Sequence, residues 1–222
     1  MVDPKNVVLS EDELDRCREF SEKSARNQQR AEFGQKTTAE RSLREIARDN
    51  MIGKIAEVAV AKIIEENYGV KVELDFNCYP RGEWDEQDVL INGWRIDIKG
   101  VRAGAKWLLV EWNKLAFRQK YGNLSHAYVA CTVGWDREKD EPTGWVRLEG
   151  VASLYKMRRG CKTTTEFKKG DLIPGTSTHL QADNYGIRFS DLTRDVNCFV
   201  NYIMRNPPPD GMVGGFRNPY LT

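Results

Sequence analysis

The dipeptide Asn92-Gly93 constrains the fold of this chain more than any other short motif. It lies between two β-rich runs, residues 88–91 and 94–99, and Asn-Gly is favoured in two-residue hairpin turns because both turn positions adopt φ > 0. A two-residue turn determines which residues face each other across the hairpin. The expected pairs are Ile91 with Trp94, Leu90 with Arg95, Val89 with Ile96, and Asp88 with Asp97.

Side chains alternate between the two faces of a strand, and in this hairpin one of the faces is entirely apolar. The apolar face carries Val89, Ile91, Trp94, Ile96 and Ile98. The other face carries Asp88, Leu90, Arg95, Asp97 and Lys99. We expect the first face to lie in the core and the second to hold the side chains of a reactive site. The alternative is that the polar face is simply solvated, as is most common for a hairpin.

Asp88 and Asp97 are the candidate metal ligands. Directly opposed Cβ atoms are about 4.5–5.5 Å apart, and like charges there are destabilising unless a cation lies between them. Oxygen ligands favour hard ions such as Mg²⁺, with Mn²⁺ able to substitute, and the carbonyl of Ile98 would add an oxygen. Lys99 would then place an ammonium group beside the metal, where it can orient a water molecule or balance phosphate charge.

A helix precedes the hairpin. Its apolar residues follow helical spacing for three turns and stop at Tyr68-Gly69; they are Ile52, Ile55, Ala56, Ala59, Val60, Ile63 and Ile64. Glu57 lies at the edge of this stripe with no Lys or Arg at i+4, so a surface ion pair explains it poorly. We interpret it as a carboxylate that could reach a site on the strands; the alternative is a solvated glutamate.

The remaining pattern predicts a mixed α/β fold built on one sheet. Ser10 with Glu13 indicates a helix over residues 11–30, and Thr37 with Glu40 repeats this capping motif. Asp49-Asn50 marks either a break or a joint between helices. Strands are expected at residues 71–76, 88–91, 94–99, 107–112 and 127–133, with a helix over residues 113–121.

Composition excludes several classes of protein. The 40% hydrophobic and 30% charged content is typical of a globular domain, and the longest stretch without a charged residue, residues 121–135, is too short to span a bilayer. The N-terminus does not resemble a secretion signal. Five scattered cysteines without a CxxC pair indicate a reducing compartment, so we expect a cytoplasmic location. The presence of only two histidines argues against a metal site with several histidine ligands.

The net charge of +1 conceals an uneven distribution. Residues 51–100 carry 6 basic and 10 acidic residues, and residues 101–170 carry 14 basic and 7 acidic ones. The basic segment would attract a polyanion, which the acidic segment would repel unless metal ions neutralise its carboxylates. The segment 154–170 is the candidate DNA contact, with threonines 163–165 available for phosphates; the alternative is a solvated loop. Its basic residues are Lys156, Arg158, Arg159, Lys162, Lys168 and Lys169.

Glu57 on a helix, Asp88 at the start of a strand and Asp97-Ile98-Lys99 at the end of its hairpin partner resemble the PD-(D/E)XK nuclease superfamily, over about residues 51–133. Gln87 stands where the name of the superfamily has proline. The resemblance implies a restriction-endonuclease-like αβββαβ core with a central mixed sheet, and metal-dependent hydrolysis of DNA. It also implies that Asp88 and Asp97 bind the metal, Lys99 acts on the water, and Glu57 is an auxiliary ligand or positions the water.

We therefore expect one nuclease domain over residues 1–222. It would comprise an N-terminal helical region (11–48), a catalytic core (50–153), a basic C-terminal extension (154–205) and a loose tail (206–222). The expected function is a Mg²⁺-dependent DNA endonuclease; double-strand cleavage would need two protomers, hence a homodimer. Two alternatives stay open: a non-catalytic nucleic-acid-binding or regulatory protein on the same fold, and a structure-selective repair or recombination nuclease.

Overall fold

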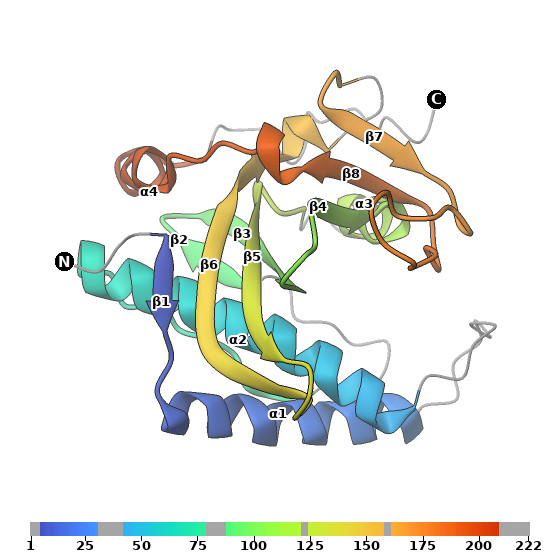
Figure 1. Ribbon diagram of the computed structural model, residues 1–222. Helices are drawn as coiled ribbons and strands as arrows, with labels where there is room; N and C mark the ends of the chain where they lie inside the picture. Colours follow the sequence, from blue (N-terminus) through green and yellow to red (C-terminus); the bar gives the residue numbers. More distant parts are fainter. Residues whose placement is uncertain (1–4, 31–41, 79–87, 121–123, 158–160, 209–222) are drawn as a thin grey trace. The chain divides into compact units, whose positions relative to one another are not determined.

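The computed structural model describes residues 5–30, 42–78, 88–120, 124–157 and 161–208, which form an α/β fold (Figure 1). The α-helices are α1 (Glu11–Arg30), α2 (Leu43–Tyr68), α3 (Trp112–Lys120) and α4 (Val196–Arg205). Two 3-10 helices are η1 (Leu154–Lys156) and η2 (Phe189–Asp191). The strands are β1 (Asn6–Val8), β2 (Val89–Ile91), β3 (Trp94–Arg102), β4 (Trp107–Glu111), β5 (Ala127–Asp136), β6 (Glu141–Ser153), β7 (Thr164–Phe167) and β8 (Asn184–Arg188).

The strands form two sheets rather than the single expected sheet. A mixed five-stranded sheet has the order β1-β6-β5-β3-β2, and an antiparallel three-stranded sheet has the order β4-β8-β7. The strand predicted at residues 107–112 is confirmed as β4, but it pairs with β8 in the second sheet, with Trp107 opposite Arg188. The restriction-endonuclease-like arrangement thus stays a prediction, whereas the α/β class is confirmed.

The chain divides into two compact units. The first contains Met1–Val89, Gly100–Ala103 and Cys131–Leu148, and the second contains Leu90–Lys99, Gly104–Ala130 and Glu149–Thr222. The expectation of one nuclease domain stays a prediction. No helix in the described part of the chain is both long enough and apolar enough to span a membrane.

Helices α1 and α2 lie side by side in the first unit (Figure 1). The expected capping box at the start of α1 is confirmed: Ser10 N–H donates to Glu13 Oε2 at 2.6 Å, and Glu13 N–H donates to Ser10 Oγ at 3.3 Å. Gly69 ends α2 in the left-handed conformation, with φ of 66°, as the sequence predicted. The stripe of α2 from Ile52 to Ile64 is buried, so this helix contributes much of the core of the unit.

Two expectations for the first unit are wrong. Helix α2 runs through Asp49 and Asn50 without a break, because these residues lower helix stability by only a few tenths of a kcal/mol. The segment 71–76 is not a strand: its side chains alternate, but it joins neither sheet of the described residues. The carbonyl of Asp75 accepts a hydrogen bond from the Lys54 side chain at 2.8 Å. The second expected capping motif, at Thr37 and Glu40, lies outside the described residues.

The C-terminal extension, residues 154–205, is folded within the second unit. It contributes β7 and β8 to the small sheet and ends in α4, whose N-terminus is capped by the Asp195 carboxylate on Cys198 N–H at 2.8 Å. Its core includes Leu154, Met157, Tyr185 and Ile187 from the extension. The expectation of a loose tail over residues 206–222 stays a prediction, and residues 209–222 lie outside the described residues.

Candidate functional site

The hairpin of β2 and β3 has the turn that the sequence predicted. Asn92 and Gly93 lie between the strands with φ of 47° and 82°, and positive φ at both positions is characteristic of a type I′ turn. The strands are hydrogen-bonded neighbours in the five-stranded sheet. The opposition of Asp88 and Asp97 that this turn implies stays a prediction.

The expected apolar face of the hairpin is confirmed. Its five side chains, Val89, Ile91, Trp94, Ile96 and Ile98, are each at most 6% exposed. On the other face the exposure varies: Leu90 is 55% exposed, whereas Asp97 is only 4% exposed. Asp97 is therefore not a solvated residue of a polar surface, and its carboxylate requires compensation from nearby groups.

Lys99 provides a positive charge beside this buried carboxylate. The ammonium group of Lys99 forms an ion pair with Asp97 Oδ1. The Asp97 side chain is 6% exposed and that of Lys99 is 32% exposed, so the lysine is the more accessible member of the pair. Removing water from such a pair strengthens the attraction and also makes it costly to break.

Glu57 forms an ion pair with a residue one turn earlier on its own helix. Its carboxylate pairs with Lys54, three residues earlier on α2, so the argument that an ion pair explains Glu57 poorly is wrong: it weighed only the i+4 position. Lys54 is itself buried, 4% exposed, and its Nζ lies 4.4 Å from the ring centre of Phe20 and 5.2 Å from that of Phe76. Two aromatic faces and a carboxylate thus stabilise this cation.

The end of β3 approaches α2 closely at Gly100, within the first unit. A Cβ atom at Gly100 would lie 2.5 Å from the carbonyl oxygen of Ile52 and 3.0 Å from the Cβ of Ala56. Only glycine permits this distance between strand and helix backbones. Gly100 directly follows Lys99, and Ala56 directly precedes Glu57, so candidate residues adjoin this contact along the chain.

Asp88 is half-buried and immediately precedes β2. Within the described residues, no three His, Cys, Asp or Glu side chains form a group that could hold a metal ion. The prediction that Glu57, Asp88, Asp97 and the Ile98 carbonyl bind a metal together stays a prediction. Carboxylate and carbonyl oxygens of this kind have the chemistry that Mg²⁺ prefers.

Side chains at the turn of the hairpin donate hydrogen bonds to carbonyl groups at the C-terminal end of α4. Asn92 Nδ2 donates to the carbonyl of Ile203 at 3.0 Å, and Trp94 Nε1 donates to the carbonyl of Asn206 at 2.6 Å. These bonds satisfy the carbonyl of Ile203 in the last turn of α4 and that of Asn206 just beyond it. The sequence gives no sign of these contacts, because their partners are more than 100 positions away.

The candidate DNA contact is only partly described. Arg158 and Arg159 lie outside the described residues. Lys162, Lys168 and Lys169 are exposed, but Lys168 forms an ion pair with Asp183 at 3.0 Å, which raises the pKa of the lysine. Lys156 donates to the carbonyl of Asp191 at 3.1 Å.

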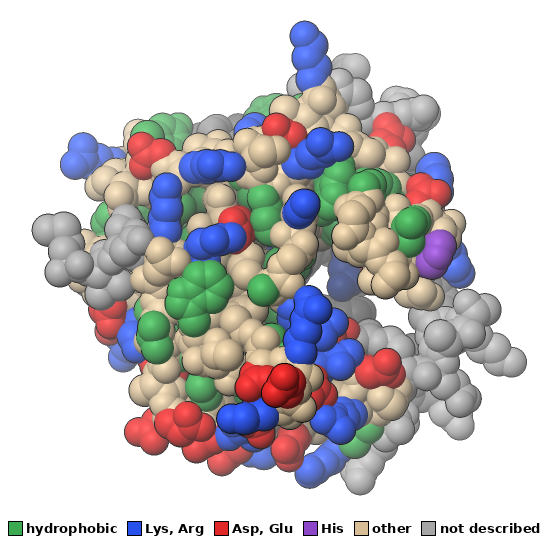
Figure 2. Space-filling model, in the orientation of Figure 1, with side chains coloured by type: hydrophobic (Ala, Val, Ile, Leu, Met, Phe, Trp, Pro, Cys, Tyr) green, Lys and Arg blue, Asp and Glu red, His purple; other side chains and the backbone are tan. Residues whose placement is uncertain are grey.

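The threonines of this segment are less available to phosphate than expected, because the Thr164 hydroxyl donates to the carbonyl of Lys156. In Figure 2, basic and acidic side chains are interspersed over the visible face. The uneven charge along the sequence is thus not accompanied by separate acidic and basic patches on that face.

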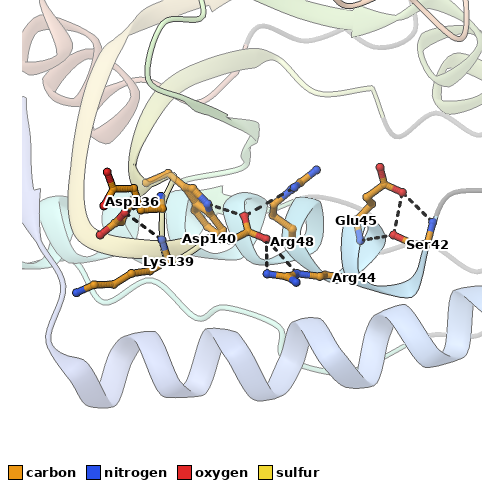
Figure 3. A network of polar contacts seen from close by, with 9 residues as sticks. Ser42, Arg44, Glu45, Arg48, Asp136, Lys139 and Asp140 are labelled. Atoms are coloured by element: carbon orange, nitrogen blue, oxygen red, sulfur yellow. Dashed lines mark hydrogen bonds and ion pairs between the residues drawn. The ribbon is translucent and has the colours of Figure 1, made fainter.

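A second group of charged residues, around Asp140, is structural (Figure 3). Asp140 accepts a hydrogen bond from Trp135 Nε1 at 3.0 Å and pairs with Arg44 at 2.9 Å and Arg48 at 3.7 Å. The Trp135 hydrogen bond, followed by the two guanidinium groups, lowers the pKa of Asp140. This network ties the turn between β5 and β6 to α2.

No protein-family model matches this sequence, and the searches of curated proteins and of solved structures found no match.

Proposed function

We propose that this chain is a Mg²⁺-dependent endonuclease that hydrolyses DNA phosphodiester bonds, with Asp97 and Lys99 at the centre of its site. One observation carries this proposal: Asp97 is 4% exposed on the polar face of β3, with the Lys99 ammonium paired to it. A carboxylate can bind a hard cation, and an ammonium group next to it can bind a phosphate oxygen.

The metal would be held by Asp88 and Asp97, with the carbonyl of Ile98, and Mn²⁺ should substitute for Mg²⁺. When bound, the ion would polarise the phosphate and lower the pKa of a bound water. Glu57 enters only as an auxiliary group. Its carboxylate already neutralises Lys54, and moving it to a metal would remove that neutralising charge from a buried cation.

Lys99 and Asp97 have separate tasks in this proposal. Asp97 holds the Lys99 side chain on the polar face of β3 through their ion pair. The Lys99 side chain is 32% exposed, and its ammonium would donate to a phosphate oxygen that approaches from solvent and offset negative charge that develops there. Lys156, Lys162, Lys168 and Lys169, with Arg158 and Arg159, would bind more distant phosphates.

Incubation of the purified protein with linear, circular, single-stranded and branched DNA tests this function. Cleavage is expected in Mg²⁺ and in Mn²⁺ and should be absent in EDTA. Asp97→Asn and Lys99→Ala should each abolish it without loss of the folded circular-dichroism spectrum. Asp15→Asn is the matched control, because Asp15 pairs with Arg18 on the exposed side of α1. Full cleavage by folded Asp97→Asn protein would contradict the proposal.

The substrate and the assembly are separate parts of the proposal. Preference for branched over linear DNA would indicate a structure-selective repair or recombination nuclease with the same chemistry. Cleavage of both strands at one position should require two protomers, since one site cuts one strand. Sedimentation of the protein on cleaved duplex should then show a dimer.

A second function, a non-catalytic nucleic-acid-binding or regulatory protein, is favoured by the two lysine–carboxylate pairs. Lys99 pairs with Asp97 and Lys54 pairs with Glu57, so each of these carboxylates is compensated by the chain itself. Under this hypothesis the protein binds DNA in a salt-dependent manner, and Asp97→Asn leaves that binding unchanged. Calorimetric titration with Mn²⁺ would show no site that depends on Asp88 and Asp97.

A further inference from the structure

Arg95, Asp97 and Lys99 occupy alternate positions of β3, so their side chains leave the same face of the strand. Successive members of this row are separated by about 6.5 Å along the strand. Asp97 is buried, whereas Arg95 and Lys99 are half-buried. The row therefore places one cation on each side of a buried carboxylate, within the second unit.

Arg95 is held more firmly than a surface arginine. Its Nε donates to the carbonyl of Leu124 at 2.9 Å. Its backbone N–H donates to Nδ1 of His126 at 2.8 Å, and its carbonyl accepts from the backbone N–H of His126 at 2.8 Å. Both the main chain and the side chain of Arg95 are thus anchored to the residues that lead into β5.

His126 suits this role because it is buried and uncharged. It is 3% exposed, and its ring lies edge-on to that of Trp94, with ring centres 5.5 Å apart. Burial, followed by the charge of Arg95, lowers the pKa of His126 to about 4. Near neutral pH, Nδ1 therefore accepts the Arg95 hydrogen bond without adding a second positive charge.

We propose that Arg95 binds a backbone phosphate of the nucleic acid next to the bond that Asp97 and Lys99 act upon. This inference rests on the proposed function. An arginine has five N–H donors in a planar fork that matches two phosphate oxygens. The bond to Leu124 uses the Nε donor and sets the plane of the guanidinium. A partly buried guanidinium also attracts an anion more strongly than one in bulk water.

Fluorescence anisotropy with a short DNA duplex in EDTA tests Arg95 without cleavage. Arg95→Gln removes the charge but keeps an amide donor for the Leu124 carbonyl. We expect it to weaken binding about tenfold and to reduce the slope of log K against log salt by about one between roughly 50 and 200 mM salt. Arg95→Lys keeps the charge but not the fork, so it should bind more weakly than wild type with the wild-type slope. Thermal melts by circular dichroism establish that both variants fold.

Arg26→Ala is the matched charge control, because Arg26 pairs with Glu22 on the exposed side of α1; it should bind like the wild type. An Arg95→Gln protein with wild-type affinity and salt slope would overturn the inference, as would a wild type that does not bind DNA. If Arg95→Gln does not fold, wild-type affinity in Arg95→Lys would overturn it. Cleavage by the wild type in Mg²⁺ is scored separately: binding without cleavage contradicts the nuclease and leaves the Arg95 phosphate contact supported by its slope.

Discussion

Lys99 pairs with Asp97 two residues earlier on β3, and the two side chains differ in their exposure to solvent: 32% for the lysine and 6% for the aspartate. The pair therefore joins a buried carboxylate to a lysine whose side chain is partly exposed. A structural ion pair and a catalytic pair differ in what happens when both charges are removed together.

A double-mutant cycle on this pair separates the two roles. Lys99→Met should lower the free energy of unfolding by about 1–3 kcal/mol, because it removes a charged partner from the buried Asp97 carboxylate. Adding Asp97→Asn should recover part of that loss. Cleavage should fall at least about a hundredfold in both single variants and should not return in the double variant. Urea denaturation and a plasmid-nicking assay give the two quantities; restored cleavage in the double variant would contradict the catalytic role.

Lys54 should contribute more to stability than most lysines of this chain. Lys54→Met leaves the Glu57 carboxylate, 14% exposed, without its cation, and we expect a loss of about 3 kcal/mol in urea denaturation. The matched control is Lys62→Met: Lys62 pairs with Glu13 at 2.8 Å, but its side chain is 24% exposed and that of Glu13 is 30% exposed. Its loss should be below about 1 kcal/mol. Equal losses in the two variants would contradict the special role of Lys54.

His126 should make the folded protein sensitive to mild acid. Its pKa in the folded state is about 4, below the ordinary value of 6.5, so the unfolded chain binds the proton more readily. Its contribution to stability is full above pH 6.5 and is lost as the pH falls towards 4, by up to about 3 kcal/mol. Unfolding free energies measured across this range should fall less steeply for His126→Gln than for the wild type. His179→Gln, at an exposed position, should follow the wild type, and parallel curves for all three proteins would refute the assignment.

Two glycines that contact α2 or belong to it should respond oppositely to alanine. Gly100→Ala places a methyl group 2.5 Å from the carbonyl of Ile52 and should lower the unfolding free energy by about 1–3 kcal/mol. Gly53 lies inside α2, and a Cβ atom there would have no neighbour within 4 Å. Gly53→Ala should therefore stabilise the protein by up to about 1 kcal/mol. Thermal melts compare both with the wild type, and a neutral Gly100→Ala would contradict the close approach.

The parts of the fold that were predicted correctly depend on local interactions. The turn at Asn92-Gly93, the capping box of Ser10 and the end of α2 at Gly69 each follow from backbone preferences within a few residues. The partner of β4 could not be predicted in this way, because β8 lies more than 70 positions further along the chain. Residues 71–76 show that alternation alone does not make a strand: pairing decides it.

The candidate site also combines contacts that the sequence predicts with contacts that depend on the tertiary fold. Alternation placed Asp97 and Lys99 on one face, which their ion pair confirms. The Lys54 partner of Glu57 was within reach of the sequence, since i−3 neighbours meet on a helix. The anchoring of Arg95 by Leu124 and His126 was not, because it depends on which strand lies beside β3.

The bonds from the hairpin turn to the C-terminal segment set a limit on when the turn is completed during synthesis. Asn92 and Trp94 leave the ribosome long before Ile203 and Asn206, the residues whose carbonyls they bind at 3.0 Å and 2.6 Å. Translation at about 5–20 residues per second separates these events by several seconds. A nascent chain arrested before residue 203 thus carries the strand of Asp97 and Lys99 with its turn still untethered.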